Sequence, residues 1–526
     1  MPKQPHIILL NPDEMRWDAL GHLGNPAVHT PHLDAFAQGE AVSFRRAYCQ
    51  NPVCVPSRCS FTTGLYPHVH GHRTMQHLLH AHETSIFKEL RQAGYHVWMN
   101  ARNDLVAGQL PGLAEEHADE IFYADSSWSL PGGRGEEPAF PYSHFAGRLP
   151  GGENGDLADT RAAVQRILHP PADRPLCLFL GWVDPHPPYG APEPYYSAVD
   201  RAQLPPRIRA GETQGKSLML QRLRELSGMG DYPEKAWDEL RAAYLAQCGR
   251  IDDLFAMVCG ALKEAGIYDD SAIFFLSDHG DFCGDYDLPE KAQNSFEDCL
   301  TRVPLLIKPP KGCPVDPGIT DSLAELVDFY ATAMDYAGVA PDHDHFGRSL
   351  RPVVADRSAA VRPYAHCEGG RLPGEVQCDE YHAEGPGGAS KATPYWPKKM
   401  AQLDPLAHEK GAMICDGRWK YVHRPSGRDE LYDLAADPGE RCNRFGAPEL
   451  ADITAQLRLA LLDWYQQTCD VVPRAYDSRF TEDRLWAAVR AFCPPEREAA
   501  ARAYFRSASP GIGEAVRYVR QLAATE

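Results

Sequence analysis

Two carboxylates and an imidazole stand directly after apolar segments of the sequence, where they could hold a metal ion. Asp13 follows the segment HIILL, and Asp278 and His279 follow AIFFL. Hard divalent cations take oxygen ligands, and an imidazole nitrogen can complete such a set. We therefore predict a divalent cation at these residues, with Glu14 as a further candidate ligand. A glutamate at position 14 that only faces solvent is an equal alternative.

Cys54 opens the segment CVPSRCSFTTG, which has the features of a helix start. Pro56 suits the first turn of a helix and Gly64 suits its end. The unpaired backbone N–H groups there would lower the pKa of the Cys54 thiol, and they would equally suit a bound sulfate or phosphate. Cys54 is thus a candidate nucleophile, with Arg58 one turn along the helix, and a packed thiol is the alternative.

The fifteen cysteines follow neither a disulfide framework nor a zinc site. They are scattered from Cys49 to Cys493 without a C-x-x-C pair. Structural zinc sites and thioredoxin-like motifs need that close spacing, so we expect buried thiols in a reducing compartment. The histidines of YPHVHGHRTMQHLLHAH also lack ligand spacing, and we expect them in loop packing or on the surface.

The composition is that of a folded, acidic protein. Of the 526 residues, 43% are hydrophobic and 10% aromatic, which excludes a disordered or fibrous chain. A formal net charge of −19 argues against a nucleic-acid partner. The apolar run 7–10 is too short for a signal peptide or a membrane span, and no later window reaches about 18 apolar residues. We expect a soluble, cytoplasmic protein without a membrane partner.

Apolar segments alternate with helical segments along much of the chain, which predicts an α/β fold. The apolar segments cover 6–10, 95–100, 176–183, 272–278 and 303–308. The segments between them, such as 83–94 and 241–266, have helical length, and this alternation is typical of a mainly parallel sheet with helices on both faces.

Polar clusters follow four of the apolar segments: NPDEMR, ARND, DPHPPY and SDHGDFCGD. Functional residues of open α/β sheets gather at the carboxyl ends of the strands. We therefore expect these four clusters to converge on one site.

The composition and the apolar pattern of the sequence change in its last third. We predict a large α/β domain over 1–375, then an insertion loop and a small antiparallel-sheet subdomain over 376–470, and a helical extension over 471–526. The Gly- and Pro-rich insertion could line a substrate pocket, with Arg371, His382 and Trp396 as candidates. The helical extension is a candidate contact for a homo-oligomer.

The run CVPSR, followed by TG, resembles the signature of the type I, formylglycine-dependent sulfatases. These enzymes belong to the alkaline-phosphatase-like superfamily, together with arylsulfatases and phosphonate monoester hydrolases. The resemblance continues through DPHPPY and LSDHGDFCGDY to WKY and ELYDLAADPGERCN. It implies a large mainly parallel sheet sandwiched by helices, with a small C-terminal α+β subdomain.

The resemblance also implies site roles. Asp13, Cys54, Asp278 and His279 match the metal ligands and the cysteine that a maturation enzyme oxidises to Cα-formylglycine. Arg58 matches the arginine that supports the hydrated aldehyde, Lys291 the sulfate-binding lysine, and His186 a histidine near the leaving-group oxygen. One divalent cation is implied, calcium (Ca) first, with manganese (Mn) or magnesium (Mg) as alternatives.

The implied chemistry uses the hydrate of formylglycine. One hydroxyl attacks the sulfur, with Asp278 as the candidate base, and collapse of the resulting hemiacetal expels sulfate and restores the aldehyde. Lys291, Arg58 and the metal would stabilise the nonbridging oxygens. His186 would protonate the leaving oxygen.

One departure from the family pattern concerns residues 101–104. The family commonly has G-K-x-H there, whereas this chain has ARND. Arg102 could take the charge role of the lysine, but neither Asn103 nor Asp104 duplicates an imidazole. We retain Arg102 and Asn103 as candidate substrate-binding residues, with Asp104 as an alternative cap of the next segment.

The sequence therefore predicts a sulfuric ester hydrolase acting on a sulfate monoester of a sugar or a small organic or aryl alcohol. Phosphonate monoester or phosphodiester hydrolysis by the same machinery is the alternative. A non-catalytic relative that binds an anion is a third reading.

Overall fold

The structure is a computed structural model that describes residues 4–124, 145–151, 154–379, 384–385, 388–389, 395–474 and 479–524. The chain divides into two compact units, Met1–Asp470 and Val471–Glu526. Within the described ranges, no helix is both long and apolar enough to cross a membrane.

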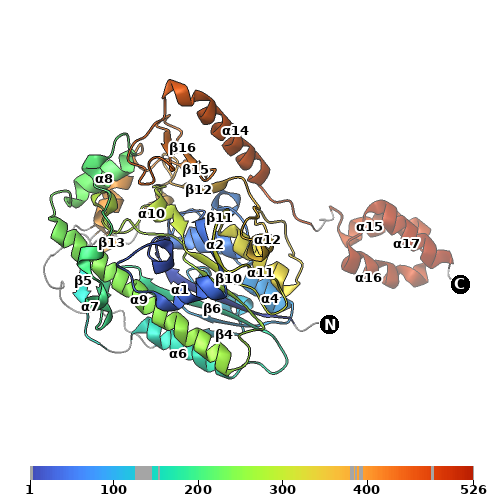
Figure 1. Ribbon diagram of the computed structural model, residues 1–526. Helices are drawn as coiled ribbons and strands as arrows, with labels where there is room; N and C mark the ends of the chain where they lie inside the picture. Colours follow the sequence, from blue (N-terminus) through green and yellow to red (C-terminus); the bar gives the residue numbers. More distant parts are fainter. Residues whose placement is uncertain are drawn as a thin grey trace. The chain divides into compact units, whose positions relative to one another are not determined.

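A large sheet runs through the first unit (Figure 1). Its strand order is β11-β2-β10-β8-β1-β6-β3-β4. The strands are β1 (His6–Asp13), β2 (Val42–Tyr48), β3 (His96–Asn100), β4 (Glu120–Phe122), β6 (Leu176–Pro185), β8 (Ser271–Leu276), β10 (Leu305–Lys308) and β11 (Gly318–Glu325). β1 pairs in parallel with β6 and β8, and β3 pairs in parallel with β6. β10 runs antiparallel to β2 and β8. The predicted mainly parallel α/β sheet is confirmed. The strand predicted at 303–308 is present as β10, and it runs antiparallel to its neighbours.

Helices cover both faces of this sheet, as the alternating side chains of β1 require. Ile7 and Leu9 belong to one buried cluster, whereas Ile8 and Leu10 belong to another. The first cluster includes side chains of α2 (Cys54–Thr63), α4 (Ile86–Gln92) and α11 (Val327–Ala337). The second includes side chains of α1 (Pro31–Gly39), α6 (Gly155–Leu168) and α9 (Glu234–Glu264).

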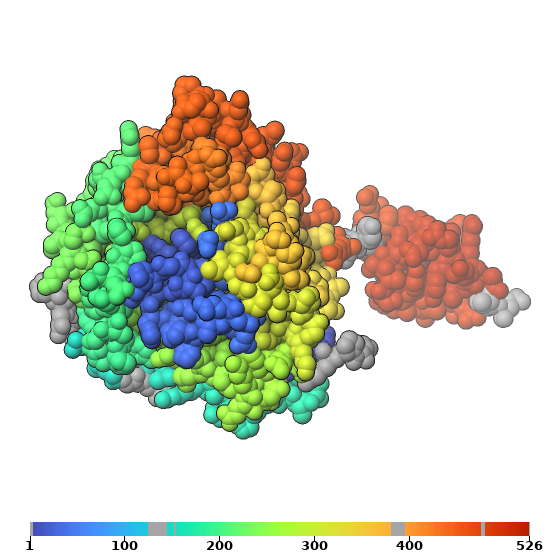
Figure 2. All heavy atoms as spheres, viewed as in Figure 1, coloured from blue at the N-terminus to red at the C-terminus, as the bar shows by residue number. Residues whose placement is uncertain are grey.

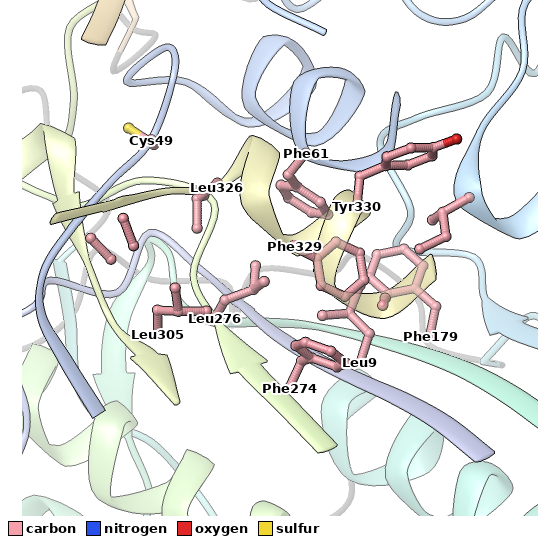
Figure 3. Packing of buried hydrophobic residues seen from close by; sticks show 14 of the residues in the cluster. Leu9, Cys49, Phe61, Phe179, Phe274, Leu276, Leu305, Leu326, Phe329 and Tyr330 are labelled. Carbon is pink, nitrogen blue, oxygen red and sulfur yellow. The ribbon is translucent and has the colours of Figure 1, made fainter. Parts of the chain in front are cut away.

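Helix α2 begins at Cys54, as predicted, and is buried along its whole length. Its Phe61 ring meets Phe329 of α11 edge to face, with 5.9 Å between ring centroids, and Phe329 meets Phe274 of β8 at 5.0 Å (Figure 3). Gly64 ends the helix at φ 72°, a left-handed conformation that glycine adopts without strain. These contacts pack the second half of α2 against α11, which in turn packs on β8 of the sheet.

A histidine, His343, caps the C-terminal end of α2. His343 Nε2 donates to the Thr63 carbonyl at 2.8 Å, and its Nδ1 lies 3.2 Å from Glu89 Oε1 and 3.0 Å from Asp342 Oδ1. Burial alone would lower the pKa of His343, but the hydrogen bonds to these groups raise it to about 9. The imidazolium also faces the negative end of the helix dipole.

We expect His343→Gln to lower the free energy of unfolding by about 1–2 kcal/mol below about pH 6.5. The folded-state pKa lies above that of the unfolded chain, so this stabilisation is complete at low pH and is lost as the pH rises through about 9. Urea denaturation of both proteins across this range measures the difference. A difference that is constant up to about pH 10 would contradict the assignment.

A second, antiparallel sheet follows in the same unit, in the order β12-β15-β16-β17. Its strands are β12 (Ala365–Gly369), β15 (Gly411–Cys415), β16 (Trp419–His423) and β17 (Glu430–Asp433). Helix α14 (Ala451–Thr468) packs on it through Leu457, Leu461 and Trp464. Figure 2 shows this part in orange on the same body as the blue-to-yellow α/β part. The predicted small α+β subdomain is therefore present.

The second unit contains α15 (Glu482–Val489), α16 (Glu498–Ala508) and α17 (Ile512–Ala524). Leu485, Phe505 and Val519, one from each helix, belong to a small core of its own.

Candidate active site

The polar clusters after four strands of the large sheet converge. Asp13 ends β1, and Arg102, His186 and Asp278 follow β3, β6 and β8. An Arg102 guanidinium nitrogen donates to Asp13 Oδ2, and His186 Nε2 lies 3.5 Å from Glu14 Oε2. Segments far apart in the sequence thus meet at one edge of the sheet.

Four buried side chains form a group that resembles a metal site, called the metal-type cluster below. Ligand atoms of Asp13, Cys54, Asp278 and His279 lie within 4.8 Å of one another. Cys54 Sγ is 3.4 Å from Asp13 Oδ1 and 3.1 Å from His279 Nε2. His279 Nδ1 donates to the Gly280 carbonyl at 2.9 Å, which leaves the Nε2 lone pair for the cluster. Two carboxylates and one such imidazole fit a divalent cation.

Arg58 holds the two carboxylates together. Its Nε donates to Asp278 Oδ2 at 2.8 Å, and its Nη2 donates to Asp13 Oδ2 at 3.0 Å. Its Nη1 donates to the Arg102 carbonyl at 3.0 Å. The last contact needs Gly181 of β6, because a Cβ there would lie 2.3 Å from that carbonyl oxygen. Arg58 is 0% exposed, like the two carboxylates that it contacts, and it does not line the cavity described below.

The prediction that the helix start lowers the pKa of Cys54 is wrong. Burial raises the pKa of the Cys54 thiol well above its ordinary value, and the Asp13 carboxylate adds to this. A protonated thiol is a poor nucleophile. Burial and the Asp13 carboxylate, rather than the helix start, therefore determine the protonation state of this thiol.

Glu14 lies beside the cluster, with a left-handed backbone at φ 69°. Its Oε2 is 2.5 Å from Lys291 Nζ, and its ligand atom is within 4.8 Å of those of Asp13 and His186. Burial raises the pKa of the Glu14 carboxyl, and Lys291 opposes this. Burial alone would lower the pKa of Lys291, but the acidic groups around it raise that pKa well above its ordinary value. Lys291 is thus a cation at this site.

His186 is neutral in this arrangement. Burial lowers its pKa well below the ordinary value, and the Lys291 charge acts in the same direction. Its Nδ1 donates to the Pro187 carbonyl at 2.7 Å. The His186 Nε2 is therefore a hydrogen-bond acceptor in the cavity.

Only one of the two candidates in the ARND segment reaches the site. Arg102 contacts Asp13, as described above. Asn103 Oδ1 instead accepts the backbone N–H groups of Leu105 and Val106, at 3.0 and 3.2 Å. Asn103 rather than Asp104 thus caps the following segment, and its amide is placed on its own loop.

A cavity of about 330 Å³ opens at Cys54. Its wall includes four predicted site residues, namely Cys54, Arg102, His186 and Lys291. The insertion adds Cys378, Asp379, Tyr395, Lys398 and Gln402. Arg371 lies behind this wall, where its Nε pairs with Asp379 at 2.8 Å, and Trp396 begins α13 (Trp396–Gln402) without lining the cavity. His382 lies outside the described residues.

Sequence reasoning missed two further parts of the wall. Met219 and Leu223 come from α8 (Leu218–Ser227), and Thr74, Met75 and Gln76 come from the segment after α3 (Pro67–His70). The apolar i, i+4 spacing in α8 marks a buried helix face and nothing more specific. Its contribution to the cavity could be seen only in the folded chain.

A family model described as Sulfatase matches residues 5–339 of this chain. The choline-sulfatase of Rhizobium meliloti is 26% identical over 507 residues, which cover 90% of this chain and 90% of that protein. The arylsulfatase of Clostridium perfringens is 26% identical over 421 residues, covering 69% of this chain and 81% of that protein.

The fold is also shared with a solved structure. A phosphonate monoester hydrolase from Silicibacter pomeroyi superposes with a TM-score of 0.69 at 24% identity, over 90% of this chain and 96% of that one. This similarity concerns the fold alone. The family model, in contrast, spans more than half of the sequence and includes the residues of the metal-type cluster. The chain therefore belongs to the sulfatase family.

Proposed function

We propose that this protein hydrolyses sulfate monoesters of sugars or small organic alcohols, with residue 54 converted from cysteine to formylglycine. The proposal rests mainly on the position of Cys54. Its Sγ lies 3.4 Å from Asp13 Oδ1 and 3.1 Å from His279 Nε2, at a cavity that Lys291 and Arg102 also line. The similarity to a choline-sulfatase and an arylsulfatase supports the same substrate class.

The donor set would hold one divalent cation, through Asp13, Asp278 and His279, with Glu14 as a candidate further ligand. Calcium is the first expectation from the family resemblance, and manganese and magnesium, which also take carboxylate oxygens, are the alternatives. When bound, the cation would stabilise charge on the sulfate oxygens and lower the pKa of a hydroxyl group at position 54. Asp278, with its ligand oxygen within 4.8 Å of Cys54 Sγ, is the proposed base for the attack.

Local cations would hold the substrate. The net charge of −19 repels an anion at long range, so binding depends on Lys291 and Arg102 in the cavity wall. Both are now paired with acidic groups, Lys291 with Glu14 and Arg102 with Asp13. A sulfate group would share these donors through charge-assisted hydrogen bonds.

His186 is the proposed acid for the leaving oxygen. Because its Nδ1–H is held by the Pro187 carbonyl, the proton to be transferred must reside on Nε2. The negative charge of a bound sulfate opposes the effect of Lys291 and so raises the pKa of His186. Nε2 could then take up a proton and pass it to the departing alkoxide.

Natively produced enzyme is expected to turn over an aryl sulfate faster than the matching aryl phosphonate monoester. We expect a chelator to abolish this activity and calcium to restore it, with peptide mass spectrometry giving the mass of formylglycine at position 54. Preference for the phosphonate ester would instead support the phosphonate monoester hydrolase alternative. Full activity with an unmodified cysteine would refute the mechanism.

A further inference from the structure

Two histidines and a glutamate outside the proposed active site converge on a single oxygen atom. His70 Nδ1 lies 2.6 Å from Glu83 Oε1, and His72 Nε2 lies 2.8 Å from the same atom. The three ligand atoms are within 4.8 Å of one another. The sequence predicts only loop packing or surface exposure here, because the histidines of this segment lack ligand spacing. The third member of the group, Glu83, follows His72 by 11 residues.

The orientation of His72 is set by a hydrogen bond on its far side. Its Nδ1 lies 2.7 Å from the His77 carbonyl oxygen. A carbonyl only accepts hydrogen bonds, so Nδ1 carries a proton and Nε2 is directed at Glu83. Histidines that bind metals almost always donate their other ring N–H to a carbonyl or a carboxylate in this way.

Glu83 is oriented in the same manner. Its Oε2 accepts the backbone N–H of His80 at 2.7 Å, which leaves Oε1 for the two histidines. Its ion-pair partners in the described part of the chain are His70 and His72, with no lysine or arginine among them. Glu83 and His72 are buried, whereas the His70 side chain is 35% exposed and leaves one side of the group open to water.

We propose that His70 Nδ1, His72 Nε2 and Glu83 Oε1 bind a zinc ion, with water as the fourth ligand. Two imidazole nitrogens favour zinc, whereas the carboxylate-rich active site favours a harder cation. Ligand atoms about 2.0–2.1 Å from a tetrahedral zinc ion lie roughly 3.3 Å apart, so small side-chain rotations would admit the ion. Zinc would replace any proton shared between the ligand atoms and release it to solvent.

This zinc site would stabilise one wall of the substrate cavity. Residues 71–85 contain no helix or strand, yet Thr74, Met75 and Gln76 among them line the cavity. The Arg73 carbonyl accepts a hydrogen bond from Gln293 Nε2 at 2.6 Å, and Gln293 lines the cavity too. The zinc ligands do not line the cavity themselves. The ion would therefore join the two ends of this segment without touching the substrate.

Zinc titration of the calcium-saturated full-length protein against a competing chelator dye tests the proposal. We expect the wild type to bind zinc at this site, and His72→Gln and Glu83→Gln to lower the affinity by about 10- to 100-fold or more. His82→Gln removes an exposed histidine of the same segment and is expected to bind as the wild type does. Asp13→Asn changes the active-site cluster and none of the three zinc ligands, and it is also expected to retain this zinc.

Hydrogen exchange supplies a second measurement. Added zinc is expected to slow amide exchange across 71–85 several-fold in the wild type and to have no effect in His70→Gln. Because His70 is partly exposed, that variant keeps the fold even where a buried substitution does not. The proposal is overturned if the calcium-saturated wild type binds no zinc, or if its zinc affinity equals that of all the ligand variants.

Discussion

Cys54→Ala is expected to lower turnover of a sulfate ester by at least about 10⁴-fold while the protein stays folded. Residue 54 is the position of α2 that lies between Asp13 and His279, and alanine has no group that can be oxidised to an aldehyde. The nearest hydroxyl of the motif, Ser57 Oγ, donates to the Asp278 carbonyl at 2.6 Å and is not available as a substitute. The kcat/KM on an aryl sulfate measures the loss.

Cys59→Ala is the matched control for this variant. Cys59 lies in the same helix and is equally buried, but it belongs to the hydrophobic core instead of the metal-type cluster. We expect its removal to cost about 1–2 kcal/mol of stability and to leave turnover within about tenfold of wild type. Near-normal turnover by Cys54→Ala would show that residue 54 takes no part in the reaction.

Arg58→Met is expected to lower the free energy of unfolding of the metal-free protein by about 3–5 kcal/mol. Arg58 is fully buried and donates to both Asp13 and Asp278, which are buried as well. Burial alone would raise the pKa of Asp13, and Arg102 and Arg58 together hold it well below its ordinary value. Methionine fills much of the volume but leaves these carboxylates without that charge.

A divalent cation should reduce this loss. Calcium would neutralise the same carboxylates, so we expect Arg58→Met to gain more stability from calcium than the wild type does. Chemical denaturation with calcium and with a chelator measures both values. Arg45→Met, which removes an exposed ion pair with Asp321, is the control and should cost about 1 kcal/mol or less. An equal loss with and without calcium would mean that Arg58 acts by packing alone.

The strands that carry the site were predictable because they are buried on both faces. β1, β3, β6 and β8 appear in the sequence as short continuous apolar runs. β2 and β11 were missed because their sequences, VSFRRAY and GITDSLAE, contain charged residues. β11 lies at one end of the strand order and pairs with β2, where some side chains are only partly buried. Local apolarity therefore identifies the centre of this sheet better than its edge.

The roles of individual residues were less predictable than their positions. Arg58 and Arg102 are both arginines near a motif, but only Arg102 lines the cavity. Asn103 was a candidate because it stands in the ARND segment, whereas its side-chain oxygen caps its own loop. The direction of the Cys54 pKa shift depends on burial and on Asp13, which is 41 residues away in the sequence. A local motif does not show which residues line a cavity, which backbone groups a side chain binds, or how deeply a thiol is buried.

The sequence by itself determined the family resemblance and the α/β class, because motifs and apolar runs are local properties of a chain. It also predicted a set of residues to bind a cation and a sulfate group. Only the tertiary structure decided which residues line the cavity and which stand behind it. It also brought Glu83 to His70 and His72. Burial made His186 neutral, and the acidic groups around Lys291 kept that side chain a cation. Contacts between distant segments and exclusion of water arise on folding, and they control hydrogen bonding and pKa more strongly than sequence neighbours do.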